Sequence, residues 1–193
     1  MEAKPIGIFV LLASSTFSAA AQDDSRLEVF AGYAHQRGDS LAPSRDGWVA
    51  SETAFIRPWV GIEVELSGMY GKYDQPPFAD RSGGTGLEDN RLGYLAGPRF
   101  RLVRTDAFTL GAHALFGVTQ TDFEGNAFFG QNPVPIRLRA KSTDFAGVIG
   151  PALDTHLTKH FSWRLQPDWA FRSTHWTRGS LRLATGPLFR FGL

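Results

Sequence analysis

The chain has 193 residues, a length that suits one domain, and it carries 20 Lys and Arg residues against 19 Asp and Glu residues. The resulting net charge of +1 excludes the strongly basic surface typical of proteins that bind nucleic acid. The absence of cysteine excludes disulfides, thiolate metal sites and a cysteine nucleophile.

The first 21 residues have the layout of a cleaved signal peptide. Lys4 precedes the apolar stretch IGIFVLLA, and alanines at 19–21 form an A-x-A cleavage site before Gln22. The apolar stretch is too short to cross a bilayer as a helix, which needs about 20 residues. A buried N-terminal helix of a cytosolic domain is the alternative. We therefore expect export and a single mature domain over 22–193.

Hydrophobicity in the remaining chain alternates with a period of two, which indicates strands. In the segment 60–70, Ile62 and Val64 fall on one face, while Glu63 and Glu65 fall on the other. The same alternation predicts eight strands, most of them about as long as the 9–11 residues that a tilted membrane strand needs. The predicted strands are 26–35, 48–56, 60–70, 92–102, 108–118, 145–153, 161–171 and 181–193.

The predicted connections alternate between short and long. Short connections fall at 57–59, 104–106 and 155–160, and long polar ones at 36–47, 74–90, 122–140 and 173–180. Outer-membrane barrels have short turns on the periplasmic side and long loops on the external side. The alternation therefore favours an all-β protein, an eight-stranded antiparallel transmembrane up-and-down β-barrel.

The composition of the two strand faces separates a membrane barrel from a soluble one. One face is rich in aromatic residues, whereas the other is charged, with Glu63, Glu65, Arg99, Arg101, Arg164, Asp168, Arg182 and Arg190. Such charges are costly in the apolar core of a soluble barrel or sandwich, but are tolerated as pairs in a polar lumen. The soluble fold remains the alternative.

Three Gly-Pro dipeptides, at 97–98, 150–151 and 186–187, fall inside predicted strands. Proline cannot donate a hydrogen bond to a sheet and is usually confined to edges or bulges. A closed barrel has no edge, so we predict a β-bulge at each dipeptide.

The stretches DGWVASETAFIRPWVGIEVELSG, GPRFRL, HALFGV and LTKHFSWRLQPDWAF, with the terminal RLATGPLFRFG, resemble the small porin-like, eight-stranded outer-membrane β-barrel family common in acidobacterial genomes. The resemblance covers nearly the whole mature chain. It implies location in the outer membrane, contact with outer-membrane lipid, and capture by the barrel-assembly machinery. Its C-terminal assembly signal would consist of Phe189, Phe191 and Leu193, with Leu193 in place of the more usual aromatic residue.

Glu63, Glu65, Arg99 and Arg101 share the charged face of two neighbouring predicted strands. We predict that they form an ionic cluster that fills the lumen and closes it to bulk flow, because eight strands enclose only enough space for side chains. His113 faces the same lumen, without an evident carboxylate partner.

Other patterns point only weakly to chemistry. His156 and His160 lack a third metal ligand. In Ser173-Thr174-His175, the serine and the histidine share one strand face, but their order and surroundings do not match the motif of lipid A deacylases. The tripeptide Arg37-Gly38-Asp39 and the glycine-rich 82–86 segment are ordinary loop sequences.

These observations predict a barrel with a structural or surface-interaction role, no enzymatic activity and no cofactor. A narrow or gated channel for small solutes is the first alternative, and a lipid-modifying outer-membrane enzyme is the second.

Overall fold

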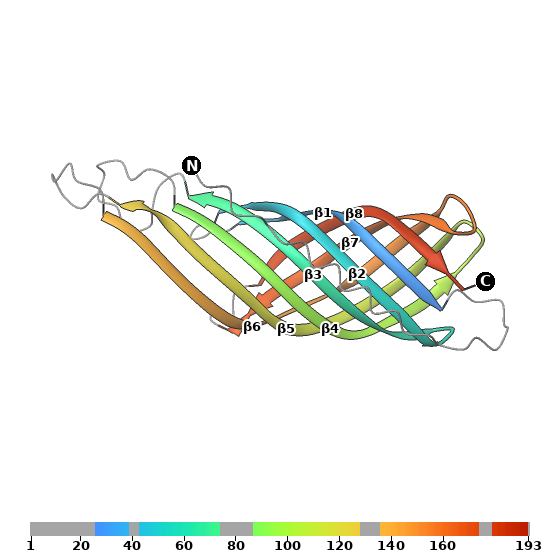
Figure 1. Cartoon of the computed structure of the whole chain (residues 1–193). Coiled ribbons are helices and arrows are strands. Elements are labelled where there is room, and N and C mark those ends of the chain that lie inside the picture. Colours follow the sequence, from blue (N-terminus) through green and yellow to red (C-terminus); the bar gives the residue numbers. More distant parts are fainter. Residues whose placement is uncertain (1–25, 39–42, 74–86, 128–135, 174–178, 193) are drawn as a thin grey trace.

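The chain forms a closed barrel of eight antiparallel strands in a computed structural model (Figure 1). Each strand pairs with the next one in the sequence, and β8 pairs with β1 to close the cylinder. The structure describes residues 26–38, 43–73, 87–127, 136–173 and 179–192. Within these ranges, no helix has the length and apolar character needed to cross a membrane. The predicted eight-stranded antiparallel barrel is confirmed, while the predicted signal peptide at 1–21 lies outside the described residues.

The strands range from 10 to 21 residues in length. They are β1 (Leu27–Gln36), β2 (Arg45–Arg57), β3 (Val60–Tyr73), β4 (Leu87–Arg104), β5 (Phe108–Ala127), β6 (Ile136–His156), β7 (Phe161–Arg172) and β8 (Ser180–Phe191). The short turns after β2, β4 and β6 lie at one end of the barrel, which we call the periplasmic end (Figure 1). At the opposite, outer end, β5 and β6 project beyond the other strands, whereas β4 begins level with the end of β3, where Leu87 pairs with Tyr73.

The predicted outer loops 74–90 and 122–140 were too long. β4 already begins at Leu87, and β5 and β6 stay paired out to Ala127 and Ile136. These extensions present polar side chains on both faces because water surrounds them beyond the membrane. They therefore lack the alternation of apolar and polar residues that marks the lipid-facing strands.

Side-chain exposure follows the predicted inside-out arrangement. Ile62 and Val64 point outward and are 52% and 51% exposed, whereas Glu63 and Glu65 point into the lumen and are 0% exposed. A girdle of aromatic side chains lies on the outside near the outer end, where the Trp48 indole donates to the Tyr70 hydroxyl. This distribution is the reverse of that in a soluble barrel, and it is the one that a lipid environment requires.

The prediction of bulges at the Gly-Pro dipeptides was wrong. The pairing of β4 with β5 is interrupted at Gly97 and Pro98, but it resumes in the same register, Ala96 with Phe116 and Arg99 with His113. The two register shifts lie instead next to periplasmic turns, between Phe55 and Arg57 in β2 and between Arg101 and Val103 in β4.

Close approach of the strands explains why glycine precedes these prolines. A Cβ atom added to Gly97 would lie 2.1 Å from the carbonyl oxygen of Ala114, and one added to Gly150 would lie 2.3 Å from that of Pro167. In the β6–β7 register, Pro151 stands opposite Pro167, so neither residue has an N–H to donate to the gap in the ladder. The strands lose a few hydrogen bonds at these positions without inserting a residue.

Candidate functional site

A continuous set of paired charges occupies the lumen from its periplasmic end to its middle, and we call it the lumen ionic network. Five carboxylates and five guanidinium groups contribute, together with one imidazole. Its members are Glu28, Glu63, Glu65, Asp154 and Asp168, with Arg99, Arg101, Arg164, Arg182 and Arg190, and His113. Seven of the eight strands supply these residues, so the network ties the barrel wall together across its interior.

Arg164 on β7 is the centre of the periplasmic part of the network. It donates from Nε and Nη2 to the two carboxylate oxygens of Asp154, at 2.7 and 3.0 Å, and from Nη2 to Glu28, at 3.0 Å. Glu28 also accepts from Arg101 at 2.7 Å. All of these side chains are almost completely buried, and buried charges are tolerated when they are paired and hydrogen-bonded in this way.

The part of the network nearer the middle of the barrel is built around Arg182 and His113. Arg182 donates to both oxygens of Glu65, at 2.5 and 2.8 Å, and to Asp168 at 2.6 Å. The two ring nitrogens of His113 lie 3.0 Å from Glu63 and 2.9 Å from Asp168. His113 therefore has two carboxylate partners, from β3 and β7, that its position in the sequence did not reveal.

The four residues of the predicted ionic cluster belong to this network but do not form one contact group. Arg99 lies 3.3 Å from Glu63, as proposed, whereas Glu65 pairs with Arg182 and Arg101 pairs with Glu28. The register explains the difference, because Glu65 is opposite Leu95, several residues from Arg101 along the strand. Across so narrow a lumen, a long side chain reaches the far wall more readily than a distant position on the adjacent strand.

Four residues that shape the lumen were not predicted from the sequence. Glu28 was not singled out, although it lies on the lumen face of β1, and Asp154 falls one residue beyond the predicted strand 145–153. Phe30 and Phe55 also point inward, and the Arg101 guanidinium lies 3.5 Å from the centroid of the Phe55 ring. Strict use of the alternation in every strand would have found Glu28 and Phe30.

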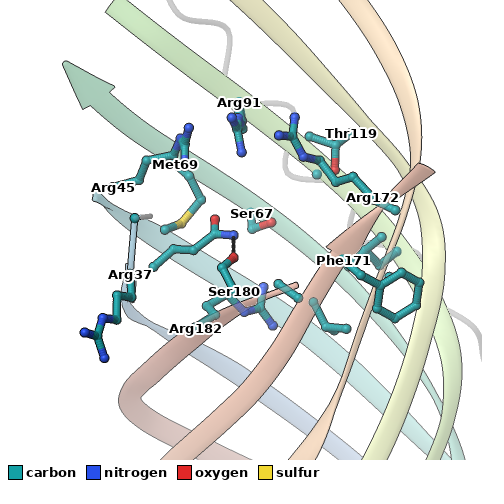
Figure 2. Close-up of a pocket in the computed structure, with 18 residues that line it drawn as sticks. Arg37, Arg45, Ser67, Met69, Arg91, Thr119, Phe171, Arg172, Ser180 and Arg182 are labelled. Carbon is teal, nitrogen blue, oxygen red and sulfur yellow. Dashed lines mark hydrogen bonds between the residues drawn. The ribbon is translucent and has the colours of Figure 1, made fainter. Parts of the chain in front are cut away.

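The outer half of the lumen differs in character. Of two apolar clusters, one extends from Phe30, beside Arg164, outward to Met69, and the other lies around Leu95 and Leu115. Above them lies a cavity of about 100 Å³, which we call the arginine cup (Figure 2). The arginines that line it are Arg37, Arg45, Arg91, Arg172 and Arg182.

A single carboxylate serves two arginines of the cup. The Asp89 carboxylate accepts from Arg45 and, at 2.9 and 2.8 Å, from Nε and Nη2 of Arg91. Arg172 lies 3.9 Å from Asp144, and Gln36 donates to the Ser180 hydroxyl at 2.5 Å (Figure 2). Arg45, Asp89 and Arg91 were not identified from the sequence because the predicted loops 36–47 and 74–90 contain Arg45 and Asp89, and Arg91 precedes the predicted strand.

Ion pairs also cover the projecting strands outside the membrane. Lys141 lies 3.1 Å from Asp122, and the hydrogen bond from Arg137 lowers the pKa of the exposed Glu124 carboxyl. Exposed pairs of this kind contribute about 0–1 kcal/mol each, so they solubilise the extension more than they stabilise it.

The weaker candidates have simpler roles or lie outside the described part of the chain. His156 is hydrogen-bonded to Thr109, and His160 contacts the Arg190 carbonyl oxygen. Among the residues that the structure describes, no group of His, Asp and Glu is suited to hold a metal ion. Thr174 and His175, Asp39 and the 82–86 segment lie outside the described residues.

The apolar exterior, the paired charges of the lumen and the closed antiparallel sheet together define an integral β-barrel of the outer-membrane class. Solved structures of small bacterial outer-membrane barrels have the same fold. The attachment invasion locus protein Ail of Yersinia pestis is 12% identical, with a TM-score of 0.58, and Neisserial surface protein A is 12% identical, with a TM-score of 0.56. Each comparison covers 88% of this chain and 100% of the other.

A further structure of Ail, in complex with the heparin analogue sucrose octasulfate, is 13% identical with a TM-score of 0.58, and it too covers 88% of this chain and 100% of its own. No protein-family model and no curated protein matches the sequence. At these identities the likeness concerns the fold, and the resemblance to the acidobacterial type stays a prediction.

Proposed function

We propose that this protein is a closed outer-membrane barrel that acts through its outer end as a surface-interaction protein, without conducting solutes and without catalysing a reaction. The observation that carries the proposal is the lumen ionic network. It crosses the barrel interior with side chains such as Glu63, Arg164 and Asp168 that are 0% exposed.

Charge pairing supports closure more strongly than the narrow diameter alone does. An open pore keeps its lumen charges in water, whereas the five carboxylates of this network each contact at least one guanidinium group within the barrel. An ion that entered would have to break these contacts and would find no wetted path to replace them. Two of the similar structures, an attachment invasion protein and a surface protein, have names that agree with a role at the cell surface.

Conductance measurement tests this proposal. Purified protein reconstituted in planar bilayers should show no steady ionic current. A variant with Glu28→Ala, Asp154→Ala and Arg164→Ala removes the core of the network while keeping the local charge nearly balanced, so it should admit water and conduct. A steady, ohmic current through the wild-type protein would instead establish the alternative, a narrow channel for small solutes.

A further inference from the structure

We propose that the outer part of β6 binds an extended segment of a partner protein as an added strand, and that this segment carries carboxylates at alternate positions. The part of β6 concerned is 136–145, which we call the free edge. The inference rests on the proposed surface role and names the kind of partner that the outer end recognises.

The free edge results from the unequal lengths of neighbouring strands. β6 pairs with β5 from Ile136, opposite Ala127, to the periplasmic end. Its pairing with β7 begins only at Ala146, so no strand among the described residues occupies the other side of 136–145 (Figure 1). At a rise of about 3.3 Å per residue, this edge is roughly 30 Å long.

The backbone of the free edge is suited to pairing with another strand. Exposed edges have unpaired N–H and C=O groups, and proteins usually interrupt them with proline, a β-bulge or a short strand. The 136–145 sequence, IRLRAKSTDF, contains no proline and no glycine, and its register with β5 is unbroken. The edge therefore offers a regular row of donors and acceptors to which an extended segment can add.

Cationic side chains on the free edge determine the chemistry of the partner. Arg137, Arg139 and Lys141 alternate along one face of β6 and are 73%, 54% and 65% exposed. Their acidic neighbours come from β5, where Glu124 contacts Arg137. Asp122 lies 3.1 Å from Lys141 and 3.9 Å from Arg139, so one carboxylate serves two cations. On the free side, carboxylates of an added strand would stand opposite these cations.

The same charges argue against a second copy of the free edge as the partner. Two such edges, paired antiparallel around their middle, would place the cations of one chain opposite those of the other. Like charges directly opposite each other destabilise paired strands. Ala140 and Ser142, on the other face of β6, are small and exposed, so the intervening positions of the partner can carry small or hydroxyl side chains.

Fluorescence anisotropy tests the proposal on the full barrel in neutral maltoside micelles. The probe is a labelled peptide with alternating residues, Thr-Glu-Thr-Glu-Thr-Glu-Thr. The control peptide, Thr-Thr-Glu-Glu-Glu-Thr-Thr, has the same composition and charge but does not place its carboxylates on one face of a strand. The wild-type protein should bind the alternating peptide about fivefold more tightly than the control, because cross-strand charge pairs form only with the alternating peptide.

Two protein variants distinguish the free edge from the overall charge of the barrel. Arg139→Gln combined with Lys141→Gln should weaken binding of the alternating peptide by about fivefold, because both cations opposite the peptide are removed. Arg37→Gln combined with Lys72→Gln removes the same charge from exposed positions at the outer ends of β1 and β3. This control should change the affinity by less than about twofold, and both variants should keep the heat-modifiable mobility of the wild-type barrel.

N-methylated peptides test whether a strand is added. The N–H groups of successive residues in an extended peptide point to opposite sides, so methylation at the glutamates blocks one edge of the peptide and methylation at the threonines blocks the other. One of these two peptides should lose binding while the other keeps it. If both keep the affinity of the unmodified peptide, no strand is added and the proposal is overturned.

Three further results would overturn the proposal. Equal binding of the alternating and control peptides, or equal losses in the two double variants, would mean that diffuse charge attracts the probe. Absence of binding to the wild-type protein would mean that the cations of β6 only protect its edge from pairing. A barrel that fails to bind but does not conduct would remove the free edge as a site and leave the proposed closure intact, whereas a barrel that binds and conducts would contradict closure alone.

Discussion

The two halves of the lumen are built by the same alternation of residues, yet their inward-facing polar side chains have different surroundings. In the periplasmic half, Glu28, Asp154 and Arg164 meet in short ion pairs. In the outer half, Arg45 and Arg91 share the Asp89 carboxylate beside a cavity that lies above an apolar layer. The contrast shows that polar side chains in the lumen do not by themselves determine whether a barrel is open or closed. The pairing of opposite charges determines it.

The physical reason lies in the cost of removing charges from water. An isolated buried charge loses several kcal/mol of hydration, and a partner in good geometry offsets that loss. The periplasmic half therefore packs tightly because every carboxylate has a guanidinium partner, whereas the outer half keeps a cavity of about 100 Å³ beside its ion pairs. Stability should thus depend mainly on the first region.

Removing residues 191–193 should have the largest effect, because it opens the barrel beside the periplasmic half of the lumen. Phe191 pairs with Leu27 at the seam between β8 and β1, next to Glu28. Without it, we expect the chain to be exported but not assembled in the membrane, as measured by loss of protease resistance and of heat-modifiable mobility on gels.

The control for this truncation is Leu181→Thr, at the outer end of the same strand, which should assemble normally. Leu193 lies outside the described residues, and its part in an assembly signal with Phe189 and Phe191 stays a prediction. Normal insertion of the truncated chain would place the signal elsewhere.

Arg164→Met should have the next largest effect, because it leaves Asp154 and Glu28 without their shared partner. Removing one partner from a buried ion pair typically costs about 3–5 kcal/mol, so we expect a decrease of about 3 kcal/mol in the free energy of unfolding. Urea unfolding in lipid vesicles, followed by tryptophan fluorescence, measures it.

Two control variants are compared with Arg164→Met. Arg57→Gln at the exposed periplasmic turn and Arg37→Gln, exposed at the outer end of β1, should each change stability by less than about 0.5 kcal/mol. An effect of Arg37→Gln as large as that of Arg164→Met would contradict the larger contribution of the periplasmic half to stability.

A double-mutant cycle sharpens the description of the network. Glu65→Gln and Arg182→Gln should show a coupling energy of about 2 kcal/mol, because their side chains share two hydrogen bonds. Glu63→Ala and Arg101→Ala, which the sequence suggested as partners, should couple by about 0.5 kcal/mol or less, since they do not contact each other. Both cycles use the same unfolding assay, and the reverse order of coupling energies would refute the observed pairing.

Substitution of Glu52 tests the outside of the barrel and should change the free energy of unfolding least. Glu52 points outward from β2, and its cross-strand neighbours are Val29 and Val64. A carboxyl group on the lipid-facing surface is unfavourable, so Glu52→Leu should raise the free energy of unfolding by about 1 kcal/mol. Glu88→Leu, beyond the membrane and beside Lys72, should gain nothing, and destabilisation by Glu52→Leu would indicate that this carboxyl has a partner in the membrane.

Much of the architecture could be predicted from the sequence because local alternation determines it. The lumen-facing residues of β3 and β5 that were predicted, Glu63, Glu65 and His113, do point inward. Strand ends at the outer side were not predicted, because β4, β5 and β6 lose their apolar face where water replaces lipid. The bulges were misplaced, because a Gly-Pro pair signals close strand approach as readily as an inserted residue.

The site was predicted only in part, and the reason is geometric. Alternation tells which side chains enter the lumen, and it identified Glu63 with Arg99 because neighbouring strands bring them within reach. The contacts of Arg182 with Glu65, and of His113 with Asp168, join strands that are far apart in the sequence.

By itself, the sequence determined the number of strands, their inward and outward faces and the charge carried by the lumen, because a period of two is a local property of the chain. Only the tertiary structure decided which charges neutralise one another and which side chains line the cavity at the outer end. Those outcomes depend on the closure of β8 against β1 and on the distance across the barrel, which no local pattern encodes.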